Sequence, residues 1–394
     1  MVIKNLKKAA IRILKAVKNQ ENIILYGDAD LDGVASVIIL KETIEHLVGL
    51  TNMERGVFLF PYFPYREKEG YGVNKKALGF LKKYSPALLI TFDCGISNFV
   101  EVKLAKKLGF EVIIVDHHEI LDKLPDASIV VDPKQKGDRY PFKKLANAGI
   151  VFKLAQELLK NKFSDILKEN FLSLVALATI FDMMPQEKDN KIFIQQGLKY
   201  LEKTSRPGLK VFIESNFIKK YKSSREISQK IISALNSFES KNHLNKTYLL
   251  LTSQSISEAK KIATDLIKKN QQKRAEIEKI TKELKNRISE KTEDQLIFEG
   301  DHSWSVSLIG SVASKICNFY QRPTFIFKKN KQESRGAVRV SKGQNGVEAM
   351  KKCSYLLETY GGHPLAAGFN IKNKNLEKFR GCLIKYFSNK RFRH

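Results

Sequence analysis

The sequence is poor in cysteine, and its four cysteines stand far apart. They are Cys94, Cys317, Cys353 and Cys382, and no two of them form a Cys-x-x-Cys pair. This spacing argues against a structural zinc site and is typical of a protein from a reducing cytosol. Long apolar runs are also missing, since none approaches the roughly 20 residues of a membrane helix. The N-terminal segment MVIKNLKKAAIRILKAVKNQ is interrupted by Lys or Arg every few residues, unlike a signal peptide. We therefore expect a cytoplasmic protein without membrane contact.

Acidic residues are few relative to basic ones. The chain has 42 Asp and Glu against 69 Lys and Arg, a net charge of +27. Such an excess favours a polyanionic partner, most often a nucleic acid. The alternative is a Lys-rich genome that codes for solvated surface lysines. Residues 371–394 are strongly basic and carry Phe379, Tyr386, Phe387 and Phe392, a mixture that can follow a phosphate backbone and stack on bases, although some of these aromatics are expected in the core.

The length and composition predict a folded protein of more than one domain. A chain of 394 residues exceeds one ordinary hydrophobic core, and its 43% hydrophobic and 28% charged residues are typical of globular proteins. The first half alternates apolar runs of strand length (NIILYGD, ALLITFDCG, EVIIVDHHE) with helical patterns such as GVASVIILKETIEHLVGL and SNFVEVKLAKKLGF. This alternation predicts an α/β fold with a parallel sheet and helices on both faces.

Acidic and imidazole side chains follow these three apolar runs. They are Asp28, Asp30 and Asp32, then Asp93, then Asp116, His117 and His118. The carboxyl ends of parallel strands meet at one rim of an open sheet, so we expect these groups to converge. A single Asp at a strand end is usually a helix cap or a turn residue. That explanation fails for the whole set, because so many carboxylates in one crevice would repel unless cations neutralised them.

The residue types at this rim indicate which metals it would bind. Mixed carboxylate and imidazole ligands suit Mn²⁺ or Mg²⁺ better than metals that prefer thiolates. Two divalent ions about 3.5–4 Å apart are the usual arrangement in phosphoryl chemistry. We therefore predict two divalent metal ions, Mn²⁺ or Mg²⁺, and a nucleic acid substrate held by the basic remainder of the chain.

Four motifs resemble those of the DHH phosphoesterase family. GDADLDG, FDCG and VDHHE are similar to its first three motifs, and Asp182 in ATIFDMMP is similar to the fourth. Within this family the chain resembles the RecJ type, the single-stranded-DNA-specific 5′ to 3′ exonucleases, and FPYFPYREKEGYGVNKKAL supports this resemblance. The metal ligands that the resemblance implies are Asp28, Asp30, Asp32, Asp93, His117, His118 and Asp182. Which of the three leading aspartates ligates directly stays open. Asp116 completes the catalytic set and is expected to orient an imidazole or the loop.

The second half resembles the DHH-associated domain of the same proteins. WSVSLIGSVASKICNFYQRPTFIF, RGAVRV and YGGHPLAAGFNI carry this resemblance. It implies a substrate-binding domain in which Arg339 and His363 contact phosphate, while Gly361 and Gly362 let backbone N–H groups approach it closely. Arg335 is either a further contact or a solvated charge, and the Gly-Gly pair taken alone could be an ordinary turn.

These motifs place the domain boundaries. We expect a DHH metal-binding catalytic domain over 1–245, a long connecting helix over 246–292 and a smaller α/β DHH-associated domain over 293–394. The helix is expected because apolar side chains recur at helical spacing from 256 to 288 without Gly or Pro, over on the order of 50 Å.

The sequence also departs from the family pattern. RGAVRV stands where relatives usually have Arg-Gly-Ser-x-Arg-Ser, so Ala337 and Val340 lack two hydroxyls that could bind phosphate. The oligonucleotide-binding barrel that commonly follows in bacterial relatives is not within these 394 residues. We expect unchanged metal chemistry, but weaker binding and lower processivity on long strands.

Two enzymatic hypotheses follow. The first is a metal-dependent hydrolase that degrades single-stranded DNA from its 5′ end in DNA repair and recombination, with two-metal activation of water. The alternative is a DHH phosphodiesterase that acts on short oligonucleotides, RNA or small phosphoesters. A third hypothesis, an inactive scaffold of the same ancestry, is opposed by the intact metal motifs. Protein partners and oligomeric state stay open.

Overall fold

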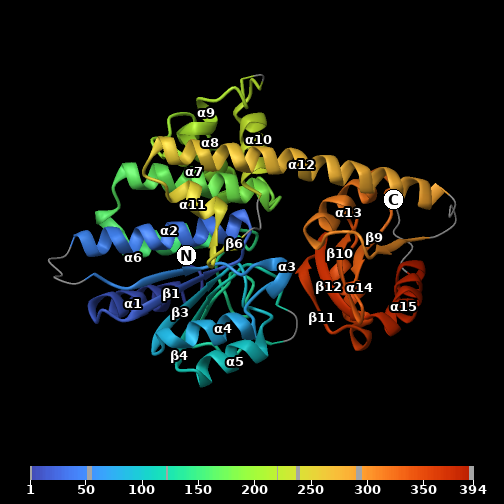
Figure 1. Ribbon diagram of the computed structural model, residues 1–394. Coiled ribbons are helices and arrows are strands. Elements are labelled where there is room, and N and C mark those ends of the chain that lie inside the picture. Colours follow the sequence, from blue (N-terminus) through green and yellow to red (C-terminus); the bar gives the residue numbers. More distant parts are fainter. Residues whose placement is uncertain are drawn as a thin grey trace. The chain divides into compact units, whose positions relative to one another are not determined.

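The computed structural model describes residues 2–50, 56–120, 123–219, 221–236, 240–289 and 295–389. The chain forms two compact units, Met1–Asn270 and Gln271–His394, which run from blue to yellow and from orange to red in Figure 1. The division falls inside one long helix, α12 (Ile256–Ser289). The domain boundaries expected at 245 and 292 stay a prediction.

The first unit is built on a five-stranded parallel sheet with the order β2-β1-β3-β4-β5. Its strands are β1 (Asn22–Gly27), β2 (Leu59–Tyr62), β3 (Ala87–Phe92), β4 (Phe110–Val115) and β5 (Ile129–Val131). The three apolar runs of the sequence form β1, β3 and β4, so the predicted α/β fold class is confirmed. The edge strands β2 and β5 were not predicted, because they are short and Pro61 in β2 weakens the strand signal.

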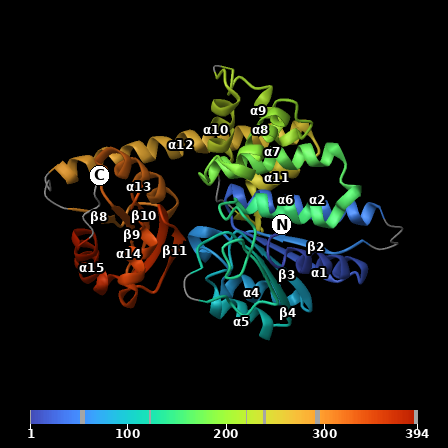
Figure 2. The same ribbon diagram turned by 180° about the vertical axis from the view of Figure 1, so that it is seen from behind.

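Helices cover both faces of this sheet, as the alternating pattern predicted. The helices of this unit are α1 (Leu6–Lys18), α2 (Leu31–Gly49), α3 (Arg66–Glu69), α4 (Lys75–Leu81), α5 (Phe99–Lys107), α6 (Asn147–Leu159), α7 (Asp165–Phe181), α8 (Lys188–Glu202), α9 (Pro207–Ile213), α10 (Ser224–Leu235) and α11 (Lys246–Thr252). Successive side chains of β1 point to opposite faces: Ile23 and Leu25 pack with α1, α2, α6 and α7, whereas Ile24 and Tyr26 pack with α4 and α5. Figures 1 and 2 show these two helical layers from opposite sides.

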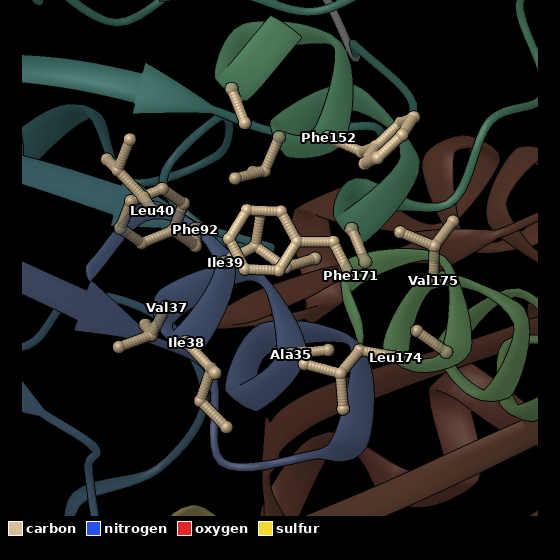
Figure 3. Packing of buried hydrophobic residues seen from close by; sticks show 14 of the residues in the cluster. Ala35, Val37, Ile38, Ile39, Leu40, Phe92, Phe152, Phe171, Leu174 and Val175 are labelled. Atoms are coloured by element: carbon tan, nitrogen blue, oxygen red, sulfur yellow. The ribbon is translucent and has the colours of Figure 1, made fainter. Parts of the chain in front are cut away.

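The larger core lies between the sheet and the helices α2, α6 and α7. Ile39 of α2 is surrounded there by Phe92, Phe152 and Phe171, all at most 2% exposed (Figure 3). Because α2 is buried on almost every side, it has apolar residues around its whole circumference rather than on one stripe. Its first turn is thereby fixed at the carboxyl end of β1. A short hairpin, β6 (Ser240–Lys241) and β7 (Leu244–Asn245), precedes α11.

The predicted long helix is present as α12, with 34 residues. Its buried side chains divide into two groups at helical spacing. Ala259 and Leu266 belong to the core of the first unit, and Ile277 and Leu284 belong to a core of the second.

The second unit contains a mixed sheet with the order β11-β12-β10-β9-β8, in which only β8 and β9 pair in parallel. Its strands are β8 (Ile297–Asp301), β9 (Thr324–Lys329), β10 (Glu333–Arg339), β11 (Thr359–His363) and β12 (Ala366–Lys372). Its helices are α13 (Val306–Tyr320), α14 (Gly346–Lys352) and α15 (Leu376–Asn389). Trp304 is 1% exposed in this core, and the Arg287 guanidinium lies 5.4 Å from the centre of its ring.

The structure shows which of the tail aromatics belong to the core. Phe379 and Phe387 are buried in the core of the second unit, so they are not available for stacking on bases. Tyr386 is half-buried, and Phe392 lies outside the described residues.

Two cysteines that are distant in sequence form a disulfide, Cys353–Cys382, with a Cα–Cα distance of 6.1 Å. Disulfides are rare in reducing compartments, so the inference from cysteine spacing to a reducing cytosol is not supported for this pair. Cys94 and Cys317 are free and buried. Among the described residues, no helix has both the length and the apolar content needed to cross a bilayer.

Candidate metal centre

The acids that follow β1, β3 and β4 are fixed at one rim by backbone hydrogen bonds. The N–H groups of Asp28, Asp93 and Asp116 each donate to the carbonyl of the last residue of the next strand, over 3.0–3.1 Å. The sheet ladder therefore continues one step beyond the strands and holds the three carboxylates in neighbouring positions. This is the convergence that the parallel sheet predicted.

The start of α2 orients two more carboxylates. Asp30 is the N-cap residue, and its side chain accepts the N–H groups of Asp32 and Gly33 over 3.2 Å. A Cβ at Gly33 would lie 2.4 Å from the carbonyl oxygen of Asp28, so this turn requires glycine. Asp32 accepts two N–H groups from the start of α6, each over 2.7 Å. Both of its carboxylate oxygens are thus held in place.

His117 presents an imidazole nitrogen to three carboxylates. Its Nδ1 lies 2.8 Å from the carbonyl oxygen of Leu145, so Nδ1 carries the proton and Nε2 is the nitrogen that faces the carboxylates. Nε2 lies 3.1 Å from Asp93 Oδ1, 3.4 Å from Asp182 Oδ2 and 3.7 Å from Asp32 Oδ2. Burial lowers the pKa of His117 well below its usual value, so the ring is neutral.

The electrostatics of this cluster favour a cation. Burial, followed by repulsion from neighbouring carboxylates, raises the pKa of Asp93 and of Asp182 well above the usual range. Burial also raises the pKa of Asp30, and it raises the pKa of Asp32 to about 7. The donor set therefore fits a divalent ion, whose charge would relieve the repulsion.

Asp116 fixes the second histidine. Its Oδ1 accepts the backbone N–H groups of His117 and His118 over 2.8 and 3.2 Å, and lies 2.8 Å from His118 Nδ1. Its Oδ2 accepts the N–H of Ile96 over 3.1 Å. Although burial opposes it, the charge and hydrogen bond of His118 lower the pKa of Asp116 to about 2. Asp116 is therefore a carboxylate that holds the loop and one imidazole.

Three groups of possible ligand atoms lie in the first unit, and within each group the atoms are at most 4.8 Å apart. They are Asp28, Asp30 and Asp93; Asp32, His117 and Asp182; and Asp93, Asp116 and His118. The structure thus brings together all seven ligands implied by the sequence, and Asp116 with them. Asp93 belongs to two of the groups, which suits a carboxylate shared by two ions.

Three neighbours of this cluster were not recognised from the sequence. Arg66 donates from Nε to Asp28 over 3.1 Å and from a terminal nitrogen to Asp30 over 2.9 Å. The Tyr71 hydroxyl donates to the carbonyl oxygen of Asp93 over 2.9 Å. Arg66 and Tyr71 stand in the segment that supported the resemblance, but no local pattern there indicated a role.

Asp132 is the third neighbour, and it follows β5. Its carboxylate is buried and accepts the N–H of Lys134 over 2.7 Å, and burial, with the charge of Asp116, raises its pKa to about 8. β5 has only three residues, so the sequence carried no strand signal that would have placed Asp132 at the rim.

In the second unit, Arg339 and His363 lie at the same end of the sheet. Ala366 of β12 pairs with Arg339 of β10 on one side and with His363 of β11 on the other. The two side chains are therefore two strand spacings apart, about 10 Å. Arg339 donates from Nε to Ser314 over 2.9 Å, and burial lowers its pKa.

The remaining predicted substrate residues differ in their surroundings. Gly362 has a φ of 130°, and a Cβ there would lie 2.7 Å from the carbonyl oxygen of Ala366, so the position requires glycine. A Cβ at Gly361 would meet nothing within 4 Å. Arg335 lies four residues from Arg339 along β10, and its guanidinium is 3.6 Å from Glu333. Arg335 thus has a partner of its own, away from the end where Arg339 lies.

A parallel sheet whose strand ends gather carboxylates and imidazoles, followed by a mixed-sheet unit, defines a two-domain protein with a candidate divalent-metal centre. Residues 22–179 match the N-terminal domain of the DHH family, and residues 293–389 match the DHHA1 domain. The chain belongs to the DHH family, and within it the chain is similar to proteins named RecJ.

Curated relatives support this assignment over nearly the whole chain. The chain is 34% identical to the single-stranded-DNA-specific exonuclease RecJ of Bacillus subtilis over 98% of its length, and covers 48% of that protein. It is 30% identical to RecJ of Salmonella typhimurium over 94% of its length, and covers 67% of that protein. The chain therefore spans about half to two thirds of the length of these relatives.

Solved structures show the same architecture. A crystal structure of exonuclease RecJ bound to manganese is similar over 100% of this chain and 96% of that one, with 27% identity and a TM-score of 0.76. RecJ of Thermus thermophilus in complex with Mn²⁺ has the same fold over 99% of this chain and 55% of that one, with 24% identity and a TM-score of 0.81.

Proposed function

We propose that the protein is a metal-dependent exonuclease that hydrolyses single-stranded DNA from its 5′ end. The observation that carries the proposal is the neutral His117 Nε2 within 3.1–3.7 Å of three carboxylates. Such a cluster is stable when it binds divalent cations. The relatives named as exonucleases for single-stranded DNA supply the substrate class.

Seven residues are proposed to hold two divalent ions, Mn²⁺ or Mg²⁺. They are Asp28, Asp30, Asp32, Asp93, His117, His118 and Asp182, and Asp93 is the shared ligand because it belongs to two of the three groups. A RecJ crystal structure that is 27% identical holds manganese, which supports this choice of metal. When bound, such ions activate water for attack on phosphorus and neutralise charge on the phosphoryl oxygens.

The protein's own groups have a positioning role in the proposed reaction. Asp116 holds the His118 ring and the loop, and the Leu145 carbonyl holds the His117 tautomer. In the second unit, Arg339 and His363 are proposed to bind phosphate oxygens of the strand, with the backbone at Gly361 and Gly362 close to them. Arg335 has a weaker claim, because it pairs with Glu333. No protein nucleophile takes part.

A DHH phosphodiesterase for short oligonucleotides, RNA or small phosphoesters is the alternative. The observation that favours it is the presence of Ala337 in β10 and Val340 just after it where relatives usually have hydroxyl residues, which leaves fewer groups for binding a long strand. Val340 is also buried and offers no polar contact.

The substrate assay compares a long single strand labelled at its 5′ end with a dinucleotide, each with Mn²⁺, with Mg²⁺ and with a chelator. Early release of the labelled mononucleotide, and a ladder from the same strand labelled at its 3′ end, would establish 5′ to 3′ digestion of single strands. Preference for the dinucleotide or for an RNA strand would favour the alternative. Equal activity in the chelator would contradict both.

Variants connect the activity to the metal centre. His117→Ala removes the nitrogen that faces three carboxylates, so it should abolish hydrolysis. Asp126→Ala is the matched control, because Asp126 is exposed, pairs with Lys106 and lies outside the three ligand groups. Its activity should equal that of the unmodified protein. The cytoplasmic location stays a prediction, and cell fractionation tests it.

A further inference from the structure

A hollow lies in the second unit beside α15. It has a volume of about 340 Å³ and is lined by Tyr355, Leu356, Lys378, Gly381, Cys382 and Lys385. This volume falls at the lower end of the range for small-ligand pockets, so it suits one group of nucleoside size. None of the residues implied by the sequence as a ligand or phosphate contact lines it.

One face of α15 lines the hollow, and the space at the middle of this face is open. Gly381 and Cys382 lie three and four residues after Lys378, and Lys385 lies four and three residues after them, which places all four on one face of the helix. Both lysines are exposed. A Cβ at Gly381 would meet nothing within 4 Å, so the space between the two lysines is open. The lysines lie about 10 Å apart along the axis, at 1.5 Å per residue.

The opposite wall is a short 3₁₀ turn (Ser354–Leu356) with an exposed aromatic ring. Tyr355 is 77% exposed, one of the most exposed large side chains among the described residues. The turn is fixed to the chain around α15 in two places. Cys353 is bonded to Cys382, and Asn375 donates to the carbonyl oxygen of Leu356 over 3.1 Å. The ring is therefore displayed by a held backbone rather than by a free loop.

We propose that this hollow binds one nucleotide of a single-stranded nucleic acid, with a base stacked on Tyr355 and the adjoining phosphates at Lys378 and Lys385. Its lining has two cations and no acid, which complements a polyanion. An exposed ring beside cations is the arrangement by which proteins hold single strands without reading their sequence. The choice of a single strand rests on the proposed function.

The hollow also revises the role of the basic tail. The aromatics of residues 371–394 were expected partly to stack on bases and partly to lie in the core, and Phe379 and Phe387 are buried. The tail supplies lysines, and the exposed ring comes from a different part of the sequence, residue 355. The binding surface is thus assembled by folding and cannot be recognised from the tail alone.

Binding is measured with a long oligothymidylate and the full chain in chelator, so that no strand is cut. Stacking of one base contributes at least about a fivefold change in Kd, so Tyr355→Leu should weaken binding roughly fivefold or more. Tyr355→Phe keeps the ring and should bind as the unmodified protein does. An oligothymidylate carrying 5-iodouracil should crosslink to Tyr355 on irradiation.

Filling the hollow is a second test that does not endanger the fold. Gly381→Leu fills the open space and replaces glycine in a helix, which raises helix propensity. It should weaken binding by a similar factor. Gly79→Leu is the matched control, because a Cβ at this helical glycine of the first unit also meets nothing within 4 Å. It should leave Kd unchanged.

Two double variants that remove the same number of positive charges test the role of the lysines. The double change Lys378→Ala and Lys385→Ala should weaken binding more than the double change Lys331→Ala and Lys342→Ala, which removes two exposed lysines outside the hollow. Unchanged binding in Tyr355→Leu and Gly381→Leu would overturn the inference. Displacement of the strand by polyglutamate through the same residues would also overturn it, in favour of an acidic protein. Weakened binding in a protein that hydrolyses no DNA would refute the proposed function alone.

Discussion

Replacing Asp132 with Asn should stabilise the first unit, and more strongly at neutral than at acidic pH. Asp132 is buried, its Oδ1 accepts the N–H of Lys134, and burial raises its pKa to about 8. In the unfolded chain the same carboxyl group loses its proton near pH 3.8. Between these two values the unfolded state binds fewer protons than the folded state, so stability falls as pH rises. Asn does not ionise in the unfolded chain, so the variant does not lose this stability as pH rises.

The size of the effect follows from the two pKa values. At pH 7 the carboxyl group is still protonated in the folded protein but ionised in the unfolded chain, which lowers the free energy of unfolding. The pH is about 3 units above 3.8, so the loss is about 4 kcal/mol at 1.36 kcal/mol per unit. At pH 5 it corresponds to about 1 unit, or about 1–2 kcal/mol. The advantage of Asp132→Asn should therefore grow by about 2–3 kcal/mol between pH 5 and pH 7. The Asn amide and the protonated Asp carboxyl group both carry a hydrogen-bond donor at this position, so the effect of burying that donor is nearly the same in the two proteins.

The assay is guanidinium unfolding of both proteins at pH 5 and pH 7, followed by far-ultraviolet circular dichroism, with and without Mn²⁺. Because Asp132 is outside the three ligand groups, the variant should also keep its hydrolytic activity. A variant that is less stable than the unmodified protein at pH 7, or equally stable at both pH values, would refute this account. Loss of hydrolysis in a stable variant would make Asp132 part of the metal centre.

Three further outcomes are expected. Asp93→Ala should abolish hydrolysis while far-ultraviolet circular dichroism and most nucleic acid affinity stay unchanged, because Asp93 belongs to two of the ligand groups; near-normal turnover would exclude the two-metal proposal. Rapid quenching during turnover should trap no phosphoryl- or nucleotidyl-enzyme, since water is the proposed nucleophile, and a trapped adduct would contradict this. Raising salt from 50 to 200 mM should lower the affinity for a single strand steeply, because a chain with a net charge of +27 releases counterions on binding, whereas a salt-independent Kd would mean that the basic residues do not contact phosphate.

The sequence was sufficient for the parts of the fold that have strong local signals. The apolar runs became β1, β3 and β4, and the helical spacing from 256 to 288 became α12. The convergence of Asp28, Asp93 and Asp116 followed from a rule about parallel sheets rather than from local pattern. Once three strands were recognised as parallel, the position of the candidate centre was determined.

The remainder depended on contacts that no local pattern encodes. Arg66 reaches Asp28 and Asp30 from 36 or more positions away, and the N–H groups that hold Asp32 come from the start of α6. Asp132 follows a strand of three residues, too short to recognise. The Cys353–Cys382 bond joins residues separated by 29 positions, a spacing that matches no common cysteine motif.

The burial of Trp304 has a practical consequence for experiments. It is the only tryptophan in the chain, and it lies in the core of the second unit. Its fluorescence therefore reports the packing around α13 and the later turns of α12, whereas circular dichroism reports helices of both units. Unfolding curves recorded with the two signals will coincide if the units unfold together and separate if one unfolds first. The protein thus carries a natural probe that distinguishes loss of its second unit from loss of the unit that holds the candidate metal centre.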